Sequence, residues 1–184
     1  MAARHTMGSA DAAWLHMDRP ENLMVIHSVM WFDEPVDWDR LREVVRERLV
    51  EPFPRFRQRV SEATLGVGLP SWEDDDAFDL DLHLHRVALP APGDEAALQT
   101  FVADRMTVPL DRARALWEFH LIDGYGEGSA ILARMHHAIA DGIAPMPVCR
   151  VAPGGMKRCA WEAIAACTWP GETSGSASGD SPDS

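Results

Sequence analysis

The stretch "WEFHLIDGYGEGSAILARMHHAIADG", residues 117–142, decides the fold. Its first six residues, Trp117–Ile122, and the run Ser129–His136 are rich in apolar side chains, which favours two strands. The segment between them, "DGYGEG", is rich in glycine and typical of a turn. We therefore predict a β-hairpin whose second strand delivers His136 and His137 into a loop.

More strands and helices are predicted on the N-terminal side of this hairpin. Leu23–Phe32 is apolar enough for a buried strand. Asp37 is a good N-cap for an amphipathic helix that Pro52 ends, and Asp94 caps a second helix that ends before Pro109. Strands that alternate with helices predict the α/β class, more closely an α+β two-layer arrangement with a mixed sheet and flanking helices.

Two segments alternate apolar and charged residues, which predicts strands: "RFRQRV", Arg55–Val60, and "DLDLHLHRVAL", Asp79–Leu89. The arginines of the first could meet an anionic ligand, but a solvated face that pairs with local carboxylates is the favoured interpretation. The second would place four metal-ligand types on one face: Asp79, Asp81, His83 and His85. Side chains two residues apart on a straight strand lie about 7 Å apart, so four of them rarely converge on one ion. We predict no metal site.

Composition narrows the classes of function. The net charge of −12 disfavours nucleic acid as a partner, because a nucleic-acid binder needs clustered Lys and Arg. The sequence holds no uncharged apolar run long enough to span a membrane, and its N-terminus has no continuous apolar signal core. All three cysteines fall in the last quarter of the chain, so no disulfide framework is implied. These features favour a cytoplasmic chain.

The character of the sequence changes near residue 145. Clustered proline, cysteine and the only lysine, Lys157, follow, and the end, "GETSGSASGDSPDS", cannot bury a core. We predict one domain over residues 9–144 and a low-order tail over residues 145–184. The tail is either a natural flexible terminus or the product of a reading frame that changed soon after Ala144, and the second hypothesis is favoured. Translating the underlying DNA in the other two frames distinguishes them.

The candidate chemistry lies in "HHAIADG", His136–Gly142. A general base works best when it titrates near neutrality, and imidazole meets that need better than a carboxylate. Asp141 could orient the imidazole of His137 or hold the loop closed by pairing with an Arg. Gly142 has no Cβ and allows backbone or substrate to approach closely.

The segment "HHAIADG" resembles the HHxxxDG motif of the bacterial wax ester synthase/diacylglycerol acyltransferase family, which belongs to the chloramphenicol acetyltransferase-like group. Peptide-synthetase condensation domains share that motif. The flanks "DAAWLHMDRPENLM", "FPRFRQRV", "WEDDDAFDLDLHLHRVALPAPG" and "PLDRARALWEFHLIDG" resemble the lipid-forming family, and the resemblance covers about Ser9 to Ala144. One departure is Ala115, where the family usually has Pro.

The resemblance implies a role for each motif residue. His137 is the general base that deprotonates the acceptor hydroxyl, His136 shapes the pocket, and Asp141 and Gly142 support the loop. The substrates are long-chain acyl-CoA and diacylglycerol or a fatty alcohol, without a cofactor or metal. Such substrates imply peripheral contact with membrane or lipid inclusions.

The family fold has two similar halves with the site between them, and this chain resembles only the N-terminal half. Two hypotheses of different class follow: an acyltransferase that is active once a partner supplies the missing half, or an inactive or lipid-binding fragment. A condensation domain acting on carrier proteins is a third and less favoured interpretation.

Overall fold

The computed structural model describes residues 4–62 and 68–140. The helices and strands follow one another in this order: β1 (Arg4–Thr6), α1 (Ser9–Met17), β2 (Val25–Phe32), α2 (Trp38–Val45), a π-helical turn (Arg46–Val50), a 3-10 turn (Pro54–Arg57), β3 (Gln58–Ser61), β4 (Ser71–Asp74), a second 3-10 turn (Leu80–Leu82), β5 (Leu84–Ala88), α3 (Glu95–Met106), β6 (Trp117–Tyr125), β7 (Gly128–His136) and α4 (His137–Ala140).

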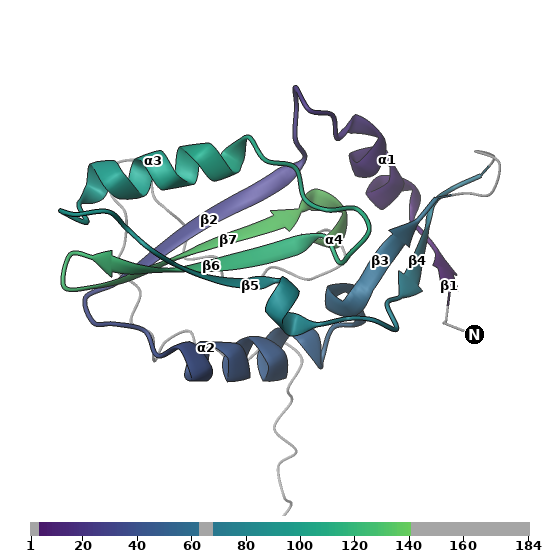
Figure 1. The fold of residues 1–184 in the computed structure, drawn as a ribbon. Helices are drawn as coiled ribbons and strands as arrows, with labels where there is room; N and C mark the ends of the chain where they lie inside the picture. The colour runs from purple at the N-terminus through teal and green to yellow at the C-terminus, as the bar shows by residue number, and fades with distance from the viewer. Residues whose placement is uncertain (1–3, 63–67, 141–184) are drawn as a thin grey trace, which may run out of the picture.

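The central element is a four-stranded sheet in the order β2-β7-β6-β5 (Figure 1). β6 and β7 form the predicted antiparallel hairpin, and β2 adds to β7 in the antiparallel sense along its whole length. β5 lies parallel to β6, so the sheet is mixed, as predicted. A smaller antiparallel sheet, β1-β4-β3, stands beside it.

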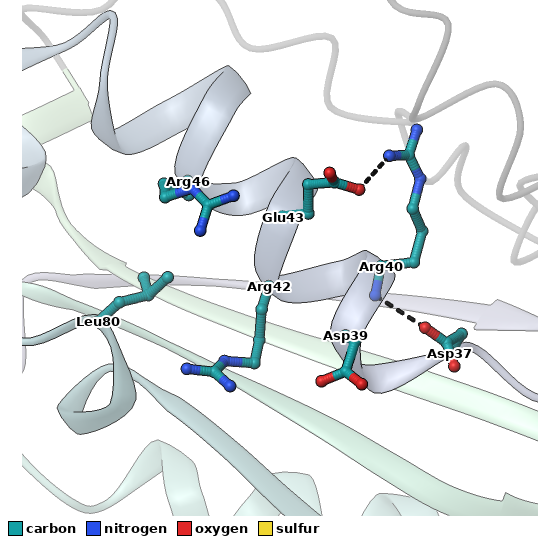
Figure 2. A pocket seen from close by; sticks show the side chains of 7 residues that line it. All are labelled: Asp37, Asp39, Arg40, Arg42, Glu43, Arg46 and Leu80. Carbon is teal, nitrogen blue, oxygen red and sulfur yellow. Dashed lines mark hydrogen bonds and ion pairs between the residues drawn. The ribbon is translucent and has the colours of Figure 1, made fainter.

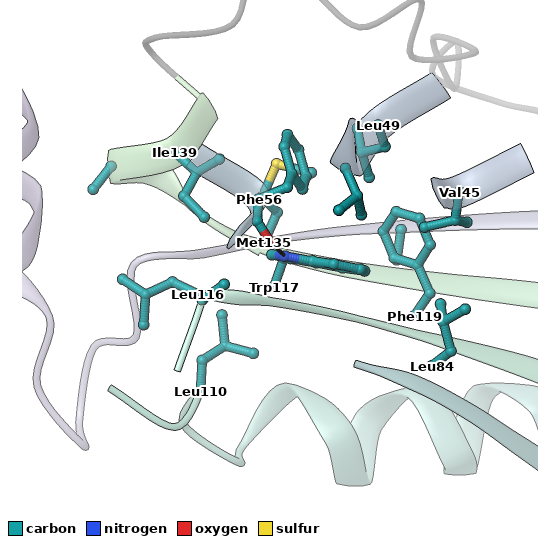
Figure 3. Packing of buried hydrophobic residues seen from close by; sticks show 14 of the residues in the cluster. Val45, Leu49, Phe56, Leu84, Leu110, Leu116, Trp117, Phe119, Met135 and Ile139 are labelled. Carbon is teal, nitrogen blue, oxygen red and sulfur yellow. Dashed lines mark hydrogen bonds between the residues drawn. The ribbon is translucent and has the colours of Figure 1, made fainter. Parts of the chain in front are cut away.

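Helices cover both faces of the larger sheet (Figure 1). Leu98 of α3 packs on Ile122 and Leu132 on one face. On the other face, α2 and the turn after it contribute to a larger core around Trp117, whose indole nitrogen donates to the Phe56 carbonyl at 2.8 Å (Figure 3). The mixed sheet with flanking helices is therefore confirmed, and helices on both faces add a third layer to the two expected.

Both predicted helix caps are confirmed. Asp37 accepts a hydrogen bond from the Arg40 amide at 2.8 Å, and Asp94 accepts one from the Ala97 amide at 2.9 Å. Each carboxylate satisfies an amide that has no partner inside the first turn and lies at the positive end of the helix dipole.

Removing the cap of α3 is a direct test of this contribution. Asp94→Ala is expected to lower the free energy of unfolding by about 1 kcal/mol, because the Ala97 amide loses its acceptor. Asp104→Ala is the matched control, since Asp104 lies in the same helix near its C-terminal end. Urea unfolding curves measure both variants, and equal effects would contradict a capping role for Asp94.

Two of the predicted strands begin differently from what alternation indicated. In Arg55–Val60, the first three residues form a 3-10 turn that starts at Pro54, and only the rest is strand. Proline fixes a helical φ at the start of the turn, and the turn buries Phe56 completely. Burial of that one ring outweighs the alternating pattern.

The second difference lies in Asp79–Leu89. Asp79 accepts a hydrogen bond from the Asp81 amide at 2.9 Å and caps a 3-10 turn, so the strand begins only at Leu84. The predicted alternation of apolar and charged faces therefore fails before Leu84: Leu82 is 42% exposed, whereas Leu84 is 4% exposed.

The same turn separates the four residues considered as metal ligands. His83 is buried between the rings of Phe78 and Trp117 and hydrogen-bonds to the Trp117 carbonyl, while Asp81 pairs with Arg42. The arginines of the other segment also have local partners: Arg59 pairs with Glu73, and Arg55 lies over the Trp72 ring.

Candidate active site

The histidine pair lies where β7 ends and α4 begins. His136 is the last residue of the strand and His137 the first of the short helix, so His137 is not in the loop that the sequence predicted. The His136 amide donates to the Leu116 carbonyl at 3.0 Å, and the His137 amide donates to the Met24 carbonyl at 2.9 Å. Backbone contacts to two separate segments thus fix the direction of both side chains.

His136 points into the protein and is 1% exposed. Its Nδ1 accepts a hydrogen bond from the Ala138 amide at 3.0 Å, so the proton of a neutral ring is on Nε2. Nε2 faces an Asp18 carboxylate oxygen at 3.6 Å, which is too long for a hydrogen bond. Burial lowers the pKa of His136 to about 4, against the opposite effect of the Asp18 carboxylate. The ring is therefore neutral at pH 7.

Asp18 is held in place from two sides. Its carboxylate accepts hydrogen bonds from the Met24 amide at 2.8 Å and from the Arg112 guanidinium at 3.1 Å. Arg112 also donates to the Leu15 carbonyl at the end of α1 at 2.9 Å. The Asp18–Arg112 ion pair thus links the end of α1 and the segment before β6 to the two histidines.

His137 is half-buried and stacks on Trp14 of α1, with ring centroids 4.6 Å apart and an angle of 21° between the ring planes. The contact between α1 and α4, visible in Figure 1, is continued by Leu15 and Ile139, which are both buried in the main core. The indole covers one face of the imidazole, and the residue as a whole remains partly exposed. A side chain held in this way can take a proton from a group that approaches its edge.

Sequence reasoning found the two histidines and missed three side chains around them: Trp14, Asp18 and Arg112. Two of these lie in "DAAWLHMDRPENLM" and the third in "PLDRARALWEFHLIDG". The segments were singled out for their resemblance, but no spacing rule brings them together. Asp141 and Gly142 lie outside the described residues, so their predicted roles stay predictions, as does the tail over residues 145–184.

A charged hollow lies elsewhere, along α2 (Figure 2). It is lined by six charged residues and Leu80: Asp37, Asp39, Arg40, Arg42, Glu43 and Arg46. Its arginines already have carboxylate partners, since Arg40 pairs with Glu43, Arg42 with Asp81 and Arg46 with Glu51. The hollow contains neither histidine of the pair and is not the candidate site.

Among residues 4–62 and 68–140, no helix has the length and apolar character needed to cross a membrane.

Comparison with known proteins shows which family the chain resembles. Residues 7–152 match the model of the wax ester synthase/diacylglycerol acyltransferase catalytic domain. A probable diacylglycerol O-acyltransferase of Mycobacterium tuberculosis is 31% identical over 146 residues, which cover 77% of this chain and 54% of that protein. A putative diacylglycerol O-acyltransferase of Mycobacterium bovis is 46% identical over 96 residues, 52% of this chain and 21% of that protein. The chain thus spans about half the length, or less, of these relatives.

Solved structures give the same picture. The wax ester synthase/diacylglycerol acyltransferase from Marinobacter aquaeolei VT8 superimposes with a TM-score of 0.63 at 29% identity, over 75% of this chain and 35% of that one. The first condensation domain of the calcium-dependent antibiotic synthetase superimposes with a TM-score of 0.59 at 19% identity, over 73% of this chain and 34% of that one. The second likeness is one of fold alone.

Proposed function

Since the chain belongs to the wax ester synthase/diacylglycerol acyltransferase family, we propose that it carries the base-bearing part of an enzyme that moves a long-chain acyl group from acyl-CoA to a hydroxyl group. The acceptor is diacylglycerol or a fatty alcohol. The observation that carries the proposal is the position of His137, which directly follows β7, stacks on Trp14 and is half-buried.

The chemistry assigned to His137 is proton transfer. A nitrogen of the neutral ring takes the proton of the acceptor hydroxyl while the hydroxyl oxygen attacks the thioester carbonyl. The new C–O bond forms, the C–S bond breaks, and the proton passes from the imidazolium to the departing CoA sulfur. His137 thus ends the cycle neutral.

His136 has a different part in this proposal. Its ring is buried and its Nδ1 is occupied by the Ala138 amide, so it holds the first turn of α4 in place. It also keeps a second positive charge away from the imidazolium that forms at His137. The Asp18 carboxylate, which Arg112 holds, faces the other ring nitrogen of His136 at 3.6 Å.

The proposal includes the C-terminal half that the longer relatives contain. The chain covers 35% of the structure of its Marinobacter relative. Closing the site excludes water and orients the acceptor, which contributes a large part of the rate in acyl transfer. Lipid binding without turnover is the second candidate. Contact with membrane or lipid inclusions is proposed from the insolubility of the substrates.

Turnover of the purified chain tests the proposal. The chain is incubated with a long-chain acyl-CoA and either diacylglycerol or a fatty alcohol, alone and with the C-terminal half of a full-length relative added, and release of CoA thiol is measured. His137→Ala is expected to lower turnover at least about a hundredfold, because a general base contributes that much or more. His5→Ala, at an exposed histidine of β1, is the control and is expected to keep full activity.

The outcomes separate the candidates. Equal turnover in wild type and His137→Ala would contradict the assigned base. Absence of turnover in the wild-type chain in both arms would favour the second candidate.

A further inference from the structure

A second group of chemistry-bearing side chains lies on the α3 face of the sheet, away from the histidine pair. His85 is directly opposite His120 on the neighbouring parallel strand, and Glu118 lies two residues before His120 on the same face. The Nε2 atom of His120 is 3.0 Å from one oxygen of Glu118, and that of His85 is 3.8 Å from the other. One ligand atom from each of the three residues lies within 4.8 Å of the other two.

This group differs from the four residues considered from the sequence, and it shares only His85 with them. A straight strand keeps its alternate side chains apart, but here two adjacent strands contribute and the longer Glu118 side chain reaches between the imidazoles. The rings of His85 and His120 lie against each other with centroids 4.8 Å apart. The ligand atoms therefore converge instead of standing in a line.

The spacing is close to that of a zinc site. Nitrogen and oxygen ligands lie about 2.0 to 2.2 Å from Zn²⁺, so in tetrahedral geometry two ligand atoms are about 3.4 Å apart. The two separations between imidazole nitrogen and carboxylate oxygen, 3.0 and 3.8 Å, lie on either side of this value. Two imidazoles and a carboxylate also match the chemistry that zinc prefers and leave a fourth position for water.

The ion has a route to these ligands. The side chain of His85 is 38% exposed and that of Glu118 is 22% exposed, while that of His120 is 5% exposed and forms the inner wall. The site is thus open on the side of β5, the edge strand of the sheet.

Two features oppose binding and set its strength. The buried Arg134 guanidinium bonds to the Glu118 oxygen that faces His120, so its positive charge repels a cation. The Nδ1 atom of His120 is buried without a hydrogen-bond partner among the described residues, whereas tight zinc sites usually hold that N–H with an acceptor. The second oxygen of Glu118, which faces His85, is the one left for the ion.

From this geometry we propose that His85, Glu118 and His120 bind one first-row transition ion, with zinc as the best fit, more weakly than a structural zinc site. The ion joins β5 to β6 beneath α3. An ion that binds the folded chain but not the unfolded chain stabilises the fold. The proposal stands independently of the acyltransferase activity.

The test uses the full chain, stripped with a chelator and then equilibrated with Zn²⁺ by dialysis. We compare wild type, His85→Ala and His5→Ala, because His85 and His5 are both histidines at the surface of a strand. All three proteins keep Cys149, Cys159 and Cys167, so zinc on those thiols is common to them. Wild type and His5→Ala are expected to hold one zinc ion per chain more than His85→Ala.

Two further measurements locate the ion and check the fold. Zinc is expected to shift the ring nitrogen NMR signals of His85 and His120 in the wild-type chain, and to raise its thermal midpoint but not that of His85→Ala. Circular dichroism confirms that His85→Ala stays folded. Equal zinc content in wild type and His85→Ala, with unmoved ring signals, would overturn the proposal.

Discussion

Replacing Arg134 with methionine is expected to lower the free energy of unfolding by about 3 to 5 kcal/mol, the cost of leaving one member of a buried ion pair without its partner. The Arg134 side chain is 0% exposed and lies in the middle of the sheet. Its guanidinium bonds to the Glu118 carboxylate and to the Val108 carbonyl. Methionine fills much of the same volume, so the expected loss comes from the charge rather than from a cavity.

The pKa of Glu118 shows how strongly its ionised form is held. Burial alone would raise this pKa, but the hydrogen bond with His120 and the charge of Arg134 outweigh burial and lower it to about 2. Without Arg134, the half-buried carboxylate loses its main counter-charge. Urea unfolding at pH 7 measures the effect.

Two further variants identify the cause of the loss. The double variant Arg134→Met, Glu118→Gln is expected to recover part of the lost stability, because neither charge is then left alone. Arg40→Met removes an arginine from an exposed pair with Glu43 and is expected to cost only a few tenths of a kcal/mol. A loss in Arg134→Met no larger than in Arg40→Met would contradict a buried pair.

The fold was predictable where the signal is local. A capping carboxylate contacts an amide three residues away, so Asp37 and Asp94 identified two helices from sequence alone. The glycine-rich turn identified the hairpin. The 3-10 turns were missed because alternation was weighed above the local cap at Asp79 and above Pro54, although both signals are present in the sequence.

The site was predictable only as far as its motif. The side chains around the histidine pair come from separate parts of the chain: Asp18 and Arg112, which meet beside His136, are 94 residues apart. The spacing of residues in the sequence does not predict a contact between side chains that far apart along the chain. The Glu118–Arg134 pair is different, because the register of the hairpin places the two residues directly opposite each other and a charge of each sign at those positions was a usable signal.

Acid is expected to destabilise this chain well above the pH at which its carboxylates titrate, and His136 is the main reason. The pKa of an unfolded histidine lies near its ordinary value of 6.5, whereas burial lowers the pKa of His136 in the folded chain to about 4. The folded state therefore resists a proton that the unfolded state accepts. The stability that depends on a neutral ring is complete above pH 6.5 and is lost as the pH falls from 6.5 to 4.

The size of the effect follows from the shift. Each pKa unit corresponds to about 1.4 kcal/mol, so the His136 ring accounts for roughly 3 kcal/mol between neutral pH and pH 4. Burial also lowers the pKa values of His27 and His83, which adds to the loss in the same direction. His136→Gln, which does not titrate, removes only the first contribution.

Free energies of unfolding at pH 7, 5.5 and 4.5 therefore separate the contribution of His136 from the rest. The wild-type chain is expected to exceed His136→Gln in stability at pH 7, because the variant loses the packing of the ring, and this advantage is expected to shrink steadily as the pH falls. In His5→Gln the difference from wild type is expected to stay constant, since His5 is exposed. A constant difference in His136→Gln as well would show that the buried ring is not the group that acid attacks, and it would remove the reason for assigning His136 a neutral, supporting role beside His137.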